Sequence, residues 1–253
     1  MKQNKYDDAT FFAAYEKMPR SVRGLEAAGE WHVFQALMPD FRDKHVLDLG
    51  CGFGWHCRYA RERQASSVTG VDISENMLQK AREMTDDPLI TYIKMPIEEI
   101  DFPDAHFDAV ISSLSLHYVE PFESVCKKVY DCLKADGSFV FSVEHPIFTS
   151  LQGQDWYYDD RGNRLHWPVD NYQSEGVRET SFLTGNEIKY HRTISTYMNV
   201  LINAGFGITA VMEPAPSDAM LEAMPEMKDE TRRPMFLIVS AVKKPLPFAF
   251  AER

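Results

Sequence analysis

The sequence predicts an α/β protein with a doubly wound, mostly parallel sheet of seven strands. Three observations support this fold class. Short apolar runs alternate with segments of helical periodicity over the first two thirds of the chain, the first run leads into a glycine-spaced turn, and the second ends in an acidic residue. Such alternation is typical of a parallel sheet that is covered by helices on both faces.

Five buried strands are predicted in the first part of the chain, at residues 46–49, 67–71, 91–95, 107–112 and 138–143. Helices are predicted between them at residues 55–63, 75–84 and 122–133. The last of these has one apolar face, formed by Val125, Val129, Cys132 and Leu133. Residues 1–45 precede the first strand, and one or two amphipathic helices are predicted there over residues 6–38.

The character of the chain changes after residue 143. Residues 146–187 are rich in Trp, Tyr, Asp, Gly and His and show little periodicity. We expect them to form an inserted lid over a substrate, with a dimer interface or plain surface packing as alternatives. A helix is predicted at residues 187–204, ending at Gly205. Strands at 207–212 and 235–242 are expected to form a hairpin-like pair that gives the sheet a C-terminal antiparallel strand.

Length and composition favour a single soluble domain of 253 residues. The net charge of −11 disfavours nucleic-acid binding, because an acidic surface repels phosphate. The four cysteines form no C-x-x-C pair and no His/Cys cluster has zinc-finger spacing, so we expect no metal site and interpret Cys51 and Cys57 as packing residues. Without a secretory signal or a membrane-spanning apolar run, a cytoplasmic location is expected.

The strongest motif is Val-Leu-Asp-Leu-Gly-Cys-Gly-Phe-Gly at residues 46–54. Glycines at 50, 52 and 54 permit positive φ angles and let a ligand approach the backbone closely. The helix that follows directs its free N–H groups toward that ligand.

A second motif, Val-Thr-Gly-Val-Asp-Ile-Ser at residues 68–74, ends its strand at Asp72. An acid at this position of a doubly wound sheet lies beside the first turn and accepts hydrogen bonds from ribose hydroxyls. Ser74 can cap the next helix. Nicotinamide enzymes would favour a third glycine at position 55, where this chain has Trp55, so an NAD-dependent oxidoreductase is the less favoured interpretation.

Four motifs in order resemble the class I S-adenosylmethionine-dependent methyltransferases, particularly the small-molecule type 11 group. They are residues 46–54, residues 71–73, residues 96–108 with an adenine loop and the start of strand four, and Leu-Lys-Ala-Asp-Gly at 133–137. The resemblance covers roughly residues 46–143. It implies a Rossmann-like fold and S-adenosylmethionine as cofactor, with S-adenosylhomocysteine as product.

The resemblance also implies which residues bind the cofactor. Asp48 and Gly50 would lie near its methionyl part and Asp72 would hold its ribose, while Tyr15 or Arg20 would reach its carboxylate. Pro96 departs from the family pattern, in which an aspartate often bonds the adenine amine, and Glu98 could substitute. The remaining expected cofactor residues are Gly52, Ile73, Met77, Ile97 and Ser112.

Methyl transfer from a sulfonium is an in-line displacement that needs an aligned nucleophile, and a base only if the acceptor must lose a proton. His117 and His145 follow strands four and five, and we expect them to act in catalysis, with pocket lining or a structural hydrogen bond as the alternative role. The expected acceptor is a small molecule attacking through oxygen, nitrogen or carbon. A non-catalytic module that binds the same cofactor is a second hypothesis. A homodimer is a further expectation.

Overall fold

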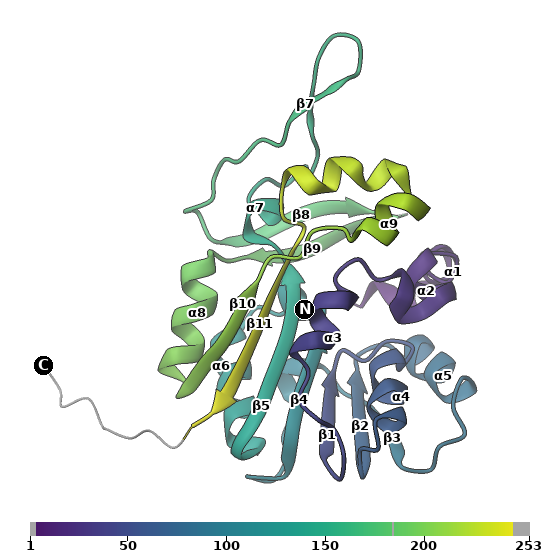
Figure 1. Cartoon of the computed structure of the whole chain (residues 1–253), viewed down its shortest axis with the longest axis vertical. Helices are drawn as coiled ribbons and strands as arrows, with labels where there is room; N and C mark the ends of the chain where they lie inside the picture. The colour runs from purple at the N-terminus through teal and green to yellow at the C-terminus, as the bar shows by residue number, and fades with distance from the viewer. Residues whose placement is uncertain (1–3, 184, 245–253) are drawn as a thin grey trace, which may run out of the picture.

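The computed structural model describes residues 4–183 and 185–244, and its centre is a mixed sheet of seven strands (Figure 1). The strand order is β10-β11-β5-β4-β1-β2-β3. Six strands of this sheet run in one direction and β11 runs opposite to them, which confirms the predicted fold class. The strands are β1 (His45–Leu49), β2 (Ser67–Asp72), β3 (Ile90–Lys94), β4 (Phe107–Ser113), β5 (Leu133–Glu144), β10 (Phe206–Met212) and β11 (Phe236–Lys243).

The order of the strands reverses beside β1. This strand pairs in parallel with β2 on one side, where Leu49 lies opposite Val71, and with β4 on the other, where Asp48 lies opposite Ile111. A reversal of this kind opens a crevice outside the carboxyl ends of the strands. The turns that follow β1, β2, β4 and β5 therefore meet at one edge of the sheet.

Helices cover both faces of the sheet because successive strand residues point to opposite sides. Leu47 belongs to the core beneath α6 (Phe122–Cys132) and α8 (Ile194–Asn203). Its neighbour Val46 points the other way, into the core beneath α4 (Trp55–Glu62) and α5 (Glu75–Glu83). On that second side α3 (Trp31–Leu37) packs Phe34 against Val140 and Ile238.

The N-terminal region forms several short helices rather than one or two long ones. They are η1 (Lys5–Asp7), α1 (Ala9–Tyr15), α2 (Pro19–Arg23) and η2 (Gly24–Ala27), followed by α3. Asp8 caps α1 by accepting a hydrogen bond from the Phe11 N–H, and Pro19 begins α2. These short elements let the chain turn repeatedly across the edge of the sheet.

The segment after β5 contains two hairpins. Strands β6 (Tyr157–Tyr158) and β7 (Arg164–His166) form an arm that projects from the molecule at the top of Figure 1. Strands β8 (Gly176–Phe182) and β9 (Gly185–His191) form a second hairpin that crosses above the carboxyl ends of the sheet. Helices α7 (Pro146–Thr149), α9 (Asp218–Ala223) and η5 (Pro225–Arg232) complete this upper part of the molecule.

The helix predicted at 187–204 is wrong over its first part. Residues 185–191 belong to β9, and the helix α8 begins only after Thr193, whose hydroxyl accepts a hydrogen bond from the Thr196 N–H. Within β9 the buried residues alternate, and they include Glu187, Lys189 and His191. A half-buried strand is usually recognised by apolar residues at alternate positions. In β9 these positions carry charged or polar residues, which are seldom buried without partners, so the pattern was not visible in the sequence.

The described part of the chain contains no helix with the length and apolar character that crossing a bilayer requires.

Candidate active site

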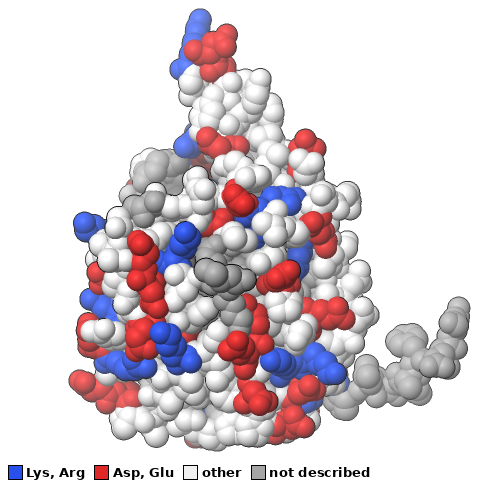
Figure 2. All heavy atoms as spheres, turned by 180° about the vertical axis from the view of Figure 1, so that it is seen from behind, with Lys and Arg blue, Asp and Glu red and all other residues white. Residues whose placement is uncertain are grey.

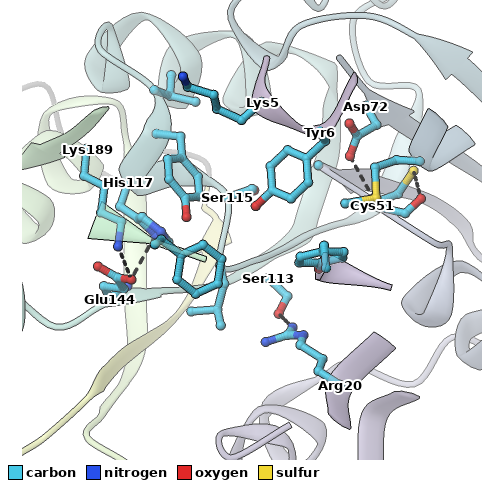
Figure 3. Close-up of a pocket in the computed structure, with 18 of the residues that line it drawn as sticks. Lys5, Tyr6, Arg20, Cys51, Asp72, Ser113, Ser115, His117, Glu144 and Lys189 are labelled. Atoms are coloured by element: carbon cyan, nitrogen blue, oxygen red, sulfur yellow. Dashed lines mark hydrogen bonds and ion pairs between the residues drawn. The ribbon is translucent and has the colours of Figure 1, made fainter. Parts of the chain in front are cut away.

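A cavity of about 840 Å³ opens at the carboxyl edge of the sheet. It runs from the glycine turn after β1 to the β8–β9 hairpin, and the N-terminal helices form one of its walls. Figure 3 shows polar side chains entering it from both ends, with Asp72 and Cys51 at one end and Lys189 and Glu144 at the other. The volume is within the range of about 300–1,000 Å³ that is usual for small-molecule sites.

The turn after β1 has the backbone that its glycines allow. Gly50, Gly52 and Gly54 have φ angles of 71°, 51° and 70°. A Cβ atom on Gly50 would lie 2.5 Å from the Ser115 Cβ, and one on Gly54 would lie 2.1 Å from the Tyr92 hydroxyl. A Cβ on Gly52 would meet no atom within 4 Å, although Gly52 lines the cavity. The turn is therefore closely packed on both sides and leaves open space above its centre.

Asp72 ends β2 beside this turn. Its Oδ2 accepts a hydrogen bond from the Gly52 N–H and its Oδ1 from the Ser74 N–H, both at 2.9 Å. Burial raises the pKa of Asp72 to about 6, although these two hydrogen bonds oppose the shift. Each carboxylate oxygen keeps a second lone pair for hydroxyl groups in the cavity.

Beyond Asp72 the cavity wall is largely apolar. Ile73 and the buried side chain of Met77 follow β2, and Pro96 and Ile97 follow β3 at the start of η3 (Ile97–Glu99). Glu98 also lines this part of the wall. Apolar side chains around a narrow space suit a planar ring system.

Arg20 enters the cavity from α2. Its guanidinium donates to Glu30 Oε1 at 2.9 Å and to the Ser113 hydroxyl at 2.7 Å (Figure 3). Glu30 is 1% exposed, and its Oε2 atom has no hydrogen-bond partner among the described residues. Tyr15 lines the cavity nearby. This corner can therefore bind a group that carries both a carboxylate and a hydrogen-bond donor.

The first N-terminal turn lies across the middle of the cavity. In Figure 3, Tyr6 extends into the space between Asp72 and His117. Contacts of the next residue hold Tyr6 in this position. Asp7 accepts hydrogen bonds from the Ser74 hydroxyl at 2.6 Å and from the Asn76 N–H at 3.1 Å. Asn76 in turn donates through Nδ2 to the Tyr6 carbonyl at 3.2 Å.

The far end of the cavity contains a buried ion pair. The Lys189 ammonium, on a residue only 2% exposed, donates to Glu144 Oε1 at 2.7 Å and to Gln154 Oε1 at 3.1 Å. Gln154 donates back to Glu144 Oε2 at 3.0 Å. Burial favours a raised pKa for Glu144, but His117 and Lys189 outweigh it, so that pKa is lowered. The three side chains form a closed polar group that faces the cavity.

His117, in η4 (Leu116–Tyr118), lies beside this polar group. Its Nδ1 accepts a weak hydrogen bond of 3.4 Å from the Glu144 N–H. Burial lowers the pKa of His117 to about 4, so the ring is neutral near pH 7. Because Nδ1 is the acceptor, the proton is on Nε2, and the ring presents a donor rather than a base.

Comparisons with known proteins agree with this geometry. A family model described as "Methyltransferase domain" matches residues 47–141. A solved structure of an S-adenosylmethionine-dependent methyltransferase from Mesorhizobium loti shares 44% identity, with a TM-score of 0.81, over 87% of this chain and 100% of that one. A Listeria monocytogenes protein assigned to the same enzymes shares 51% identity with the same TM-score and the same coverage. The chain belongs to the S-adenosylmethionine-dependent methyltransferases.

A curated relative also matches over most of its length. The N-demethylindolmycin N-methyltransferase of Streptomyces griseus is 25% identical over 84% of this chain and 91% of that protein.

The cofactor of this methyltransferase is therefore S-adenosylmethionine, and the residues present fit it. The open space above Gly52 admits a ligand against the backbone, and the free lone pairs of Asp72 suit a ribose diol. The apolar wall at Met77 and Ile97 suits adenine, and the Arg20 corner suits an amino acid group. Among residues 4–183 and 185–244, no three His, Cys, Asp or Glu side chains are grouped so that they could hold a metal ion.

The structure brings most of the residues predicted for the site to the cavity. The exceptions among the predicted cofactor residues are Asp48 and Ser112, which lie beneath its floor. Asp48 is 1% exposed and accepts a hydrogen bond from the Cys57 thiol at 3.2 Å, while Ser112 donates to the Leu49 carbonyl at 3.0 Å. The residues that do line the cavity are Tyr15, Arg20, Gly50, Gly52, Asp72, Ile73, Met77, Pro96, Ile97, Glu98 and His117.

His145 does not reach the cavity wall, contrary to the expectation from sequence. It is fully buried, and both ring nitrogens are engaged. Nδ1 accepts from the Ile147 N–H at 3.0 Å and caps α7, and Nε2 lies 2.7 Å from Glu213 Oε1. Pro146 begins α7 directly after His145, so the His145 side chain caps that helix.

Sequence reasoning missed several polar residues that line the cavity, among them Tyr6, Glu30, Tyr118, Glu144, Gln154 and Lys189. Tyr118 and Glu144 adjoin the two histidines that were selected, and a strand interpretation of residues 185–191 would have pointed Lys189 inward. No local signal distinguished Tyr6, because its place depends on how the N-terminal turn docks on α5.

Proposed function

We propose that this enzyme transfers the methyl group of S-adenosylmethionine by in-line displacement to a small-molecule acceptor that is enclosed with the cofactor. The observation that carries the proposal is that one cavity contains both the glycine turn with Asp72 at one end and a buried polar group at the other. An acceptor held beside Lys189 and Glu144 would share the space around Tyr6 with the cofactor. Phe182 and Lys189 of the β8–β9 hairpin line this cavity, whose volume suits a small molecule.

We assign the cofactor contacts from the cavity lining. Asp72 would bind the ribose hydroxyls, and Gly50 and Gly52 would support the methionyl part. Arg20 would bind the carboxylate, with Glu30 as a partner for the amino group. Ile73, Met77, Pro96, Ile97 and Glu98 would surround adenine.

The bound cofactor supplies a methyl group already activated by a positive sulfur, so the protein mainly orients and encloses the reactants. Tyr6 and Phe182 exclude water from the centre of the cavity. Lys189, Glu144 and Gln154 offer both donors and acceptors to a polar group of the acceptor. His117 adds a donor through Nε2 and does not take a proton near neutral pH.

Two further observations support a small acceptor. The Streptomyces griseus relative is an N-methyltransferase that acts on N-demethylindolmycin, which is a small molecule. The surface is acidic overall, and Figure 2 shows basic side chains interspersed with acidic ones over that face of the molecule. Such a surface offers a phosphate backbone little attraction.

The proposal is tested by incubating the enzyme with isotopically labelled S-adenosylmethionine and fractionated metabolite extracts. A labelled small-molecule product that depends on the enzyme supports it. Label that appears only in protein or RNA, or no product although the cofactor binds, contradicts it. The last result would favour the alternative of a non-catalytic module that binds this cofactor.

We also propose a cytoplasmic location, which is supported by four buried free thiols. A homodimer stays a prediction, and light scattering of the purified enzyme tests it.

A further inference from the structure

A buried carboxylate behind the cavity wall has no role in the contacts described so far. Glu187, on the inward face of β9, is 1% exposed. Its Oε2 accepts a hydrogen bond from the Tyr118 hydroxyl at 3.1 Å, and its Oε1 is buried without a hydrogen-bond partner among the described residues. Thr180, directly opposite on β8, also has a buried hydroxyl without such a partner. Buried polar groups without partners are rare in native proteins, and a catalytic role is one of the physical explanations for them.

Tyr118 connects this carboxylate to the cavity. Its side chain lines the cavity, and its hydroxyl interacts with that of Tyr6, which extends into the centre of the cavity. A hydroxyl can accept a proton on one side while it donates its own to Glu187 on the other. The Tyr118 hydroxyl thus links the cavity directly to a buried carboxylate.

The surroundings leave Glu187 ready to take up a proton. The titratable groups that face it are Tyr118 from η4, Lys189 from its own strand, Glu144 from β5, Lys5 and Tyr6 from η1, and Tyr15 from α1. Glu144 already pairs with Lys189, so that ammonium is shared rather than dedicated to Glu187. Burial raises the pKa of Glu187 to about 7, and Lys189 and Tyr118 reduce the shift only in part. A base with a pKa close to the working pH is the most effective one.

We propose that Tyr118 and Glu187 form the proton-accepting pair of this methyltransferase, and that its acceptor therefore reacts through an N–H or O–H group that loses its proton. This inference rests on the proposed function. The new bond joins the methyl carbon to the nucleophilic nitrogen or oxygen, and the carbon–sulfur bond breaks with its electron pair left on sulfur. The acceptor proton moves to the Tyr118 oxygen as the Tyr118 proton moves to Glu187, which later releases it to solvent.

Other basic groups of the cavity are less suited to this task. His117 presents its protonated nitrogen, and both oxygens of Glu144 are engaged by Lys189 and Gln154. An acceptor that is already ionised near neutral pH, such as a carboxylate, would need no such pair. The pair therefore narrows the acceptor to an amine or to a hydroxyl compound such as a phenol or an enol.

The first test needs no acceptor. Infrared difference spectra of wild type and Glu187→Gln, recorded across pH, isolate the carbonyl band of protonated Glu187 from those of other buried acids. We expect the band below pH 7 and its loss as pH rises through about 7. A carboxylate that stays ionised down to pH 5 would overturn the inference, whatever the fate of the proposed function.

The second test uses the acceptor identified by the labelling screen. We expect Glu187→Gln and Tyr118→Phe to lower kcat by about 100-fold or more and to leave the affinity for S-adenosylhomocysteine within about twofold. The rising limb of the wild-type pH–rate profile near pH 7 should disappear in Glu187→Gln. Glu179→Gln, an exposed carboxylate on the same hairpin, is the matched control. An unchanged profile in Glu187→Gln, or a carboxylate as the acceptor, would overturn the inference while methyl transfer itself stands.

Discussion

Single residues at the carboxyl edge of the sheet determine how this enzyme meets its cofactor. Asp72 is largely buried, and two backbone N–H groups orient both of its oxygens. Burial raises the pKa of Asp72 and the two hydrogen bonds lower it. Burial has the larger effect, so the pKa is raised to about 6. The carboxylate is therefore ionised near neutral pH but close enough to titration for pH to affect binding.

We expect the affinity for S-adenosylhomocysteine to fall below pH 6, because protons compete with the ribose hydroxyls for the Asp72 carboxylate. The loss should approach tenfold per pH unit below the pKa. In Asp72→Asn the affinity should be about 10–100-fold weaker and nearly constant between pH 5 and 7. Calorimetry across this range checks both statements. An equally steep pH dependence in Asp72→Asn would show that another group controls binding.

Gly52 and Gly54 provide a matched pair of substitutions at similar backbone angles. Gly52→Ala should cost only about 1–2 kcal/mol of stability for its positive φ but should abolish most cofactor binding, because its Cβ occupies the open space of the cradle. Gly54→Ala should lower stability further, by about 1–3 kcal/mol more, because its Cβ meets the ring and hydroxyl of Tyr92. Urea unfolding with a parallel binding assay separates the two effects. Full cofactor affinity in Gly52→Ala would contradict the cradle.

At the scale of elements, we expect the N-terminal turn to cover the cofactor end of the cavity. The hydrogen bonds of Asp7 to Ser74 and Asn76 fix η1 on the start of α5. Tyr6, the residue before Asp7 in η1, then extends into the space that we expect the cofactor to share with the acceptor. We therefore expect a bound cofactor to leave only after these contacts have opened.

Asp7→Ala should speed dissociation of S-adenosylhomocysteine by about tenfold, since hydrogen bonds to a charged group are lost. Stopped-flow fluorescence measures the rate. Asp86→Ala, an exposed carboxylate beyond the end of α5, should leave the rate unchanged. Equal rates in wild type and Asp7→Ala would mean that the cofactor leaves by another route.

Elements differ in how far the sequence predicts them. The strands and turns of the first 143 residues follow from apolar runs and glycine spacing, because there burial alone selects the residue types. The strand β9 does not, because its inward residues Glu187 and Lys189 are charged and are stabilised by partners distant in sequence. For the same reason most residues predicted to bind the cofactor line the cavity, while the polar residues Glu144 and Lys189 at its other end were not predicted. His145 was predicted to be catalytic because it follows a strand at the carboxyl edge of the sheet. Its side chain instead caps α7, so position at a strand end alone does not identify a site residue.

At the scale of the whole molecule, the cofactor cradle joins α2, α4 and the turns after β1, β2 and β3, so binding should stabilise the fold as a unit. S-adenosylhomocysteine at 100 times its Kd should add about 2.7 kcal/mol, which raises Tm by roughly 5–10 °C for a chain of this size. NAD at the same concentration should have no effect. Thermal unfolding with each ligand checks this, and a larger shift with NAD would refute the cofactor assignment.

The position of β11 has a consequence for how the protein is made. This strand pairs with β5 on one side and β10 on the other, so it fills the gap between them. While the ribosome is still adding residues 236–243, β5 presents an open edge and β10 has nothing to join. We expect nascent chains to expose that edge to chaperones until translation has passed residue 243, so that the sheet closes only after synthesis of its last strand.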